Sequence, residues 1–130
     1  MKGFRSSLAP VLIGVALTSA AQAESLRAVS PLPGYKCMVL NLSEQQAKDF
    51  NVHVPVRAQP AANATEVGWA AATVAVRDPL NVVNGFTEAL FPTGATVWIA
   101  SNMLRSYRDP QAKCVPSLMS NGKPGFAYPH

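Results

Sequence analysis

Apolar and polar residues alternate in several short stretches of the chain, a period of two that is typical of β-strands with one buried face. The alternation is clearest at 52–56 (VHVPV) and 73–77 (TVAVR), where valine recurs at every second position. Further strands are predicted at 37–42, 86–91 and 96–100. Pro55 has no N–H to donate to a neighbouring strand, so we expect it at a sheet edge or at a bulge.

Two segments have a helical pattern instead. The segment 43–50 (SEQQAKDF) is expected to form a helix of about two turns, because Ser43 can accept a first-turn N–H and Gln46 stands at the capping-box position. The segment 101–104 (SNML) fits a single helical turn.

Proline, glycine and asparagine mark the turns between these elements. The stretch 54–70 (VPVRAQPAANATEVGWA) is expected to be a strand, a loop of small and polar residues, and a second strand. The pairs Asp78-Pro79 and Asn84-Gly85 predict turns, and the tetrad 91–94 (FPTG) suits a type I turn, with proline second and glycine fourth.

The pattern as a whole predicts an all-β fold, because about five short strands are separated by turns. Such strands form either a small antiparallel barrel or a two-sheet sandwich. The lead-in at 30–36 is expected to be extended, and the residues around and after Cys114 are expected to form a loop-rich tail.

Residues 1–23 have the three parts of a secretory signal peptide. Lys2 and Arg5 give a positive head, 8–17 (LAPVLIGVAL) is an apolar run, and 21–23 (AQA) places small residues at a cleavage site. The run is about ten residues, well short of the roughly 20 that span a bilayer. We therefore expect residues 24–130 to be a single periplasmic or secreted domain without stable membrane insertion.

The charge pattern indicates no nucleic-acid partner. The formal charge is +4, and Lys2 and Arg5 supply part of it. The other Lys and Arg residues are scattered from Arg27 to Lys123 without a run of neighbours. A nucleic-acid surface needs them clustered.

Cys37 and Cys114 are the two cysteines of the chain, and an even count in an exported protein favours a disulfide. Closing a loop of about 78 residues stabilises a fold by roughly 4 kcal/mol in the chain-entropy model, less any native strain. A catalytic thiol would need a base, and the candidates are His53, which lies between valines, and the terminal His130. A Cys2His2 zinc site needs close pairs of ligands, which these four residues do not form, so no metal site is predicted.

The residue types present argue against an enzyme. The seven Asp and Glu residues are spread singly, without a close pair for acid–base chemistry. A single small domain leaves no room for a catalytic domain beside a targeting module. No cofactor is predicted.

The stretches 54–76 (VPVRAQPAANATEVGWAAATVAV) and 84–107 (NGFTEALFPTGATVWIASNMLRSY) together resemble a bacterial SH3-like domain of the SH3b type. The likeness covers residues 52–108. The chain departs from the family pattern at Pro55, Ala72, Phe86 and Val97. The resemblance implies a small SH3-like β-barrel that serves as a binding module, often for peptidoglycan or peptides, without catalysis. The matching positions are Val54, Val56, Arg57, Pro60, Val67, Gly68, Val76, Gly85, Trp98, Ile99, Ser101 and Leu104.

Trp69 and Phe86 each lie beside a glycine at an expected turn, where a large apolar face can remain exposed. With Tyr107 they would form an aromatic surface for a sugar ring or a proline-rich segment, with Arg57 as the polar contact. The alternative is that the rings cover the ends of the barrel and that Arg57 caps loop carbonyls or pairs with a carboxylate. Trp98 is expected in the sheet or the core.

Two binding roles fit these features. The first is a non-enzymatic module that recognises peptidoglycan or a cell-envelope protein partner. The second is a secreted inhibitor or immunity-type protein that blocks a cell-wall enzyme. Both have the same composition and motifs, so the sequence does not separate them.

Overall fold

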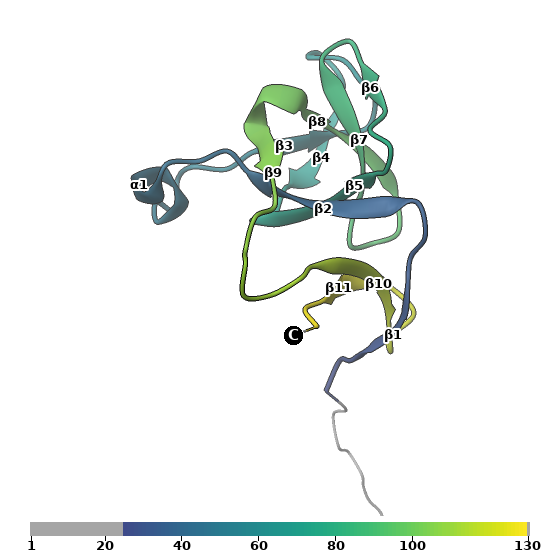
Figure 1. Cartoon of the computed structure of the whole chain (residues 1–130). Helices are drawn as coiled ribbons and strands as arrows, with labels where there is room; N and C mark the ends of the chain where they lie inside the picture. Colours follow the sequence, from purple (N-terminus) through teal and green to yellow (C-terminus); the bar gives the residue numbers. More distant parts are fainter. Residues whose placement is uncertain (1–24, 130) are drawn as a thin grey trace, which may run out of the picture.

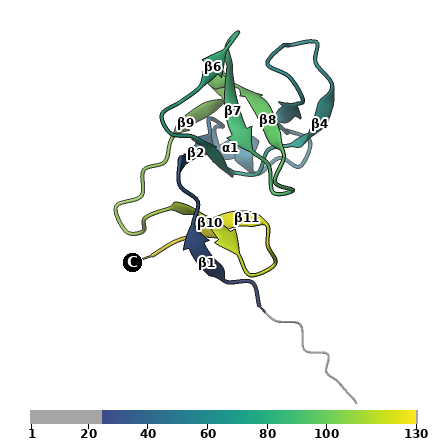
Figure 2. The ribbon, with the colours of Figure 1, turned by 90° about the vertical axis from the view of Figure 1, so that its right-hand side faces the viewer.

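Two antiparallel β-sheets make up most of the structure, a computed structural model that describes residues 25–129 (Figure 1). The all-β prediction is confirmed. The smaller sheet lies below the larger one in both views, and α1 sits on an arm that projects from the larger sheet in Figure 1 (Figures 1 and 2). The predicted signal peptide and its cleavage site lie outside the described residues. Within residues 25–129, no helix is long and apolar enough to cross a membrane.

The strands of the larger sheet are β2 (Tyr35–Leu40), β3 (Pro55–Arg57), β4 (Glu66–Trp69), β5 (Thr73–Arg77), β6 (Val82–Val83), β7 (Phe86–Leu90), β8 (Thr96–Ala100) and β9 (Leu104–Ser106). The strands of the smaller sheet are β1 (Ala28–Pro31), β10 (Val115–Met119) and β11 (Pro124–Ala127). The helical elements are α1 (Glu44–Ala47) and the 3-10 helix η2 (Ser101–Met103).

The larger sheet has the order β4-β3-β8-β7-β5-β2-β9, and β6 pairs with β7. The chain curls this sheet around one core, with η2 leading from β8 into β9 (Figure 1). In the part of the chain that the structure describes, β4 and β9 end the order and do not pair with each other. The strands therefore do not close into a barrel by hydrogen bonding.

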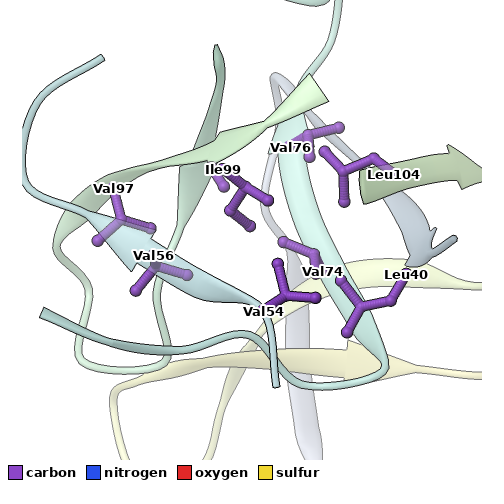
Figure 3. Packing of buried hydrophobic residues seen from close by; sticks show 9 residues of the cluster. Leu40, Val54, Val56, Val74, Val76, Val97, Ile99 and Leu104 are labelled. Carbon is purple, nitrogen blue, oxygen red and sulfur yellow. The ribbon is translucent and has the colours of Figure 1, made fainter. Parts of the chain in front are cut away.

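The core consists of aliphatic side chains that several strands point toward one another (Figure 3). The alternating valines predicted to face inward do so, since Val54, Val56, Val74 and Val76 are all buried. Ile99 of β8 is completely buried, with 0% of its surface exposed. Full burial of such a side chain contributes about 1.5–3 kcal/mol of stability, so these few residues dominate the stability of the larger sheet.

The smaller sheet corrects the prediction of a loop-rich tail, since the tail contains β10 and β11. β1 pairs with β10, and β10 pairs with β11, both antiparallel. Pro116, Pro124 and Gly125 made these segments resemble loops, because proline and glycine are depleted in strands. Here β11 is an edge strand, and Gly125 allows Met119 to lie against it, since a Cβ there would come within 2.4 Å of the Met119 Cγ.

The predicted disulfide is present and joins the two sheets. Cys37 lies buried in β2, and Cys114 lies just before β10. Their Cα atoms are 6.1 Å apart, within the usual range for a disulfide. The bridge fastens the smaller sheet to β2, the neighbour of the edge strand β9 in the larger sheet.

Most local predictions match the structure. The strands at 73–77 and 96–100 have the predicted bounds as β5 and β8. The helix is shorter than expected, one turn in place of two, but its capping box between Ser43 and Gln46 is formed. Pro55 lies beside a bulge between Val56 and Arg57, where β3 changes register against β4.

The turns follow the residues that predicted them. Asn84 and Gly85 have φ angles of 53° and 79° and join β6 to β7, because positive φ at both central positions suits the twist of a two-residue hairpin. In the tetrad 91–94, the Gly94 N–H donates to the Phe91 carbonyl at 2.8 Å, which closes the expected β-turn.

Candidate ligand-binding site

Trp69 is an ordered aromatic residue on the surface, with 56% of its area exposed. One face of its ring stacks on His53, with 4.0 Å between the ring centroids and 20° between the planes. Its indole N–H donates to Glu66 Oε2 at 3.2 Å. The register of β3 against β4 produces this arrangement, because it places Trp69 opposite Pro55 and so beside the residues that precede β3. The ring is fixed in place while much of it stays open to solvent.

An apolar cavity of about 120 Å³ lies beneath Trp69, between the larger sheet and β11. Phe91 and Phe126 line it from opposite sheets, together with core residues such as Val74 and Ile99. The Phe91 ring lies directly over Gly68, where the lack of a side chain allows this close approach. The cavity marks where the two sheets meet, and Trp69 stands at its edge.

Tyr107 lies elsewhere, in a groove of about 910 Å³ beside β9. Its hydroxyl donates a long hydrogen bond of 3.5 Å to the Ala112 carbonyl. Partial burial, and then the nearby Asp109 and Tyr128, raise the pKa of this hydroxyl above its ordinary value. Tyr107 therefore remains a neutral phenol at physiological pH.

Phe86 and Arg57 have structural contacts. Phe86 is half-buried at the start of β7, opposite Val83 and Ala100, and lines neither the cavity nor the groove. The Arg57 guanidinium donates to the Ala64 carbonyl at 3.1 Å, so it caps the loop between β3 and β4. This contact fits the alternative reading of Arg57 from the sequence.

The structure does not bring the predicted aromatic residues together. Trp69 is in β4 and Tyr107 follows β9, at the two ends of the strand order, with Phe86 on β7 between them. Among residues 25–129, none of these three rings contacts another. Trp98, as expected, is half-buried in the sheet, opposite Glu88 and Arg57.

Two features of this surface were missed by reasoning from the sequence. One is the stack of His53 on Trp69, which depends on a register that a bulge shifts. The other is the groove at Tyr107, which also contains Arg105 and Arg108. The sequence did carry a signal for this groove, since two arginines flank an aromatic residue at 105–108. The apolar floor of the groove could not be predicted, because it comes from distant segments of the chain.

Within the described residues, no group of three or more His, Cys, Asp and Glu side chains is placed to hold a metal ion. The features described above are the ordered surface tryptophan, the small apolar cavity beneath it and the groove beside β9. The chain was compared with protein-family models, with curated proteins and with solved structures, and none of them matches it.

Proposed function

We propose that this protein is a non-enzymatic binding module of the cell envelope, with an SH3-like fold, that recognises peptidoglycan or an envelope protein through Trp69. The observation that carries the proposal is the exposed Trp69 ring, held by His53 on one face and by Glu66 at its N–H. Holding a tryptophan still in solvent leaves a large apolar face ready for a ligand, because little freedom remains to be lost on binding.

The envelope location is supported by two independent features. Residues 1–23 have the pattern of a secretory signal peptide. The Cys37–Cys114 disulfide is the form that cysteines take in oxidising compartments such as the periplasm.

The SH3-like fold is supported by where the resembling positions lie. Val54, Val56, Val76, Ile99 and Leu104 all belong to the core. Gly85 forms the hairpin turn, and Ser101 begins the 3-10 helix that precedes the last strand of the larger sheet. The resemblance thus accounts for both the buried positions and the turns.

The chemistry of Trp69 limits the ligand to groups that stack on an indole. Sugar rings and proline-rich segments both present flat apolar faces of this kind, and aromatic residues that are rigid and exposed tend to dominate the energy of an interface. Glu66 holds the indole N–H, so a ligand meets mainly the apolar ring and the exposed neighbouring residue Val67.

Binding to purified sacculi, compared with binding to proteins of a periplasmic extract, tests the proposal. Wild type, Trp69→Ala and Phe50→Ala are immobilised in equal amounts. Phe50 is the matched control, because it is 99% exposed on the α1 arm and does not line the cavity at Trp69. We expect Trp69→Ala to reduce retention of one of the two ligands by about tenfold, as loss of an interface anchor does, and Phe50→Ala to leave it unchanged.

Two results would contradict the proposal: no retention from either source, or equal losses with Trp69→Ala and Phe50→Ala. Thermal unfolding of each variant shows that the fold is intact. Retention of a cell-wall enzyme whose activity falls on binding would assign the protein to the inhibitor class.

A further inference from the structure

The groove beside β9 is a wide hollow of about 910 Å³. Its floor is apolar and is made by residues of the β2 end, the α1 arm and the β4–β5 connection, among them Leu40, Leu42, Val52 and Ala72. One wall is the segment 105–109, which contains Arg105, Tyr107, Arg108 and Asp109. A volume of this size is in the range of real ligand sites.

The backbone of β9 is open on the side away from β2. β9 is the last strand in its sheet order, so in the described part of the chain no strand pairs with its outer edge. The Asn41 N–H donates to the Met103 carbonyl, and Val39 is the register partner of Arg105. Hydrogen-bonded and non-hydrogen-bonded pairs alternate along antiparallel strands, so Arg105 bonds to Val39.

It follows that Ser106 directs its N–H and carbonyl away from β2. No backbone hydrogen bond to Ser106 from elsewhere in residues 25–129 is formed. Ser106 is one of the residues that line the groove. An extended chain lying in the groove would find an unpaired donor and an unpaired acceptor at this point.

The wall of the groove has a net positive charge, because it contains Arg105 and Arg108 beside the single carboxylate of Asp109. The Arg108 side chain makes no hydrogen bond or ion pair with any residue between 25 and 129. Arg105 uses its Nε to donate to the Leu40 carbonyl at 3.4 Å, which leaves its terminal nitrogens for a ligand. The carboxylate of Asp109 already accepts the Gln111 N–H at 2.8 Å, within its own turn.

We propose that this groove binds an extended, acidic segment of a partner protein, which adds as a strand to the outer edge of β9 and places a carboxylate against Arg108. The apolar floor accepts alternate side chains of that segment, as in other complexes formed by strand addition. The cationic wall selects the charge of the partner, because complementary charges favour one partner over others. Trp69 does not line this groove, although Ala70 and Thr73 line both the groove and the cavity at Trp69. The inference does not rest on the function proposed above.

The test uses synthetic peptides of about seven residues, the length of an ordinary strand, with capped ends. One peptide alternates valine with glutamate, a second alternates valine with lysine, and a third is the glutamate peptide with N-methyl groups on alternate amides. Binding to the whole protein is measured by calorimetry, and amide exchange is followed by NMR. We expect the glutamate peptide alone to bind and to slow exchange of the Ser106 amide.

A pair of charge reversals supplies the matched control. Arg108→Glu and Lys123→Glu change the net charge equally, but Lys123 lies in the β10–β11 turn and does not line the groove. We expect Arg108→Glu to weaken binding of the glutamate peptide about tenfold, because one good charged contact is lost. Lys123→Glu should leave the binding of this peptide almost unchanged. Trp69→Ala should bind the peptide as wild type does.

The inference is overturned if the glutamate peptide does not bind, if the lysine or N-methylated peptide binds as well, or if both charge reversals weaken binding equally. It is also overturned if binding leaves exchange at Ser106 unchanged. None of these outcomes changes the effect of Trp69→Ala on the retention of sacculi or extract proteins. The two proposals can therefore fail independently of each other.

Discussion

The ring of Phe91 lies directly against the backbone of Gly68. A Cβ atom at Gly68 would stand 2.6 Å from the Phe91 Cζ, closer than real Cβ contacts. This approach lets Phe91 pack on the core and line the cavity between the sheets.

We therefore expect Gly68→Ala to destabilise the protein by about 1–3 kcal/mol, the usual cost of overpacking. Urea unfolding measures the change. The control is the same substitution in a Phe91→Leu background, because a smaller side chain removes the contact. If the cost of Gly68→Ala is equal in both backgrounds, Phe91 is not its cause.

Ile99→Ala should be among the most destabilising single substitutions in the larger sheet. Ile99 is fully buried within the valine core, and removing such a side chain costs about 2–5 kcal/mol. Val82→Ala is the exposed comparison, since Val82 is half exposed in β6, and we expect it to change stability by less than about 0.5 kcal/mol. Similar values from urea unfolding for the two variants would contradict this description of the core.

Replacing both Cys37 and Cys114 by serine should cost about 2–4 kcal/mol, the usual contribution of a disulfide. The bridge joins β2 to the start of β10, so its loss should act first on the smaller sheet. Hydrogen exchange measures this directly. We expect amides of β1 and β10 to lose protection more than those of β5 and β8, and a uniform loss would show that the two sheets unfold together.

Tyr107→Phe should change how stability depends on alkaline pH. Burial, and then Asp109 and Tyr128, raise the pKa of Tyr107 above the ordinary value of 10.0. A phenol whose pKa is higher in the folded chain stabilises the fold below the unfolded pKa, and this contribution is lost as the pH rises through the folded pKa. Wild type should therefore lose more stability than Tyr107→Phe as the pH rises through the ordinary value of 10.0 and beyond it.

Urea unfolding at several pH values compares the two proteins. Tyr35 remains in both, so its ionisation cancels in the comparison. The interaction of Tyr107 with Tyr128 is lost in the variant and is part of the measured difference. Curves that stay parallel over this range would mean that Tyr107 has the same pKa in the folded and unfolded chains.

The elements that the sequence predicts correctly are those set by neighbouring residues. Alternating valines identify β5 and the inward face of β3, and Asn84-Gly85 forms its hairpin turn because both residues tolerate positive φ. The Ser43 and Gln46 capping box is also local, because it forms between residues three positions apart. The helix is shorter than predicted because none of its residues is buried, so no packing extends it.

The parts that the sequence does not reveal depend on contacts between distant segments. β10 lacks a regular alternation and contains Pro116, and its strand pairing with β1 comes from the other end of the chain. The groove at β9 likewise combines the α1 arm, the β2 end and the segment after β9. Arg108 and Val52 carry no local signal that they line the same hollow.

The pairing of β1 with β10 also sets the order in which the chain can be completed. β1 is made early and its partner strand is made almost last, with the whole larger sheet between them. A growing chain therefore carries β1 without its partner until residues 115–119 have emerged. A strand left unpaired is a template for pairing with other chains. If translation stops anywhere before β10, the C-terminal strands are missing and β1 at the other end has no partner strand. Such a fragment would be prone to self-association.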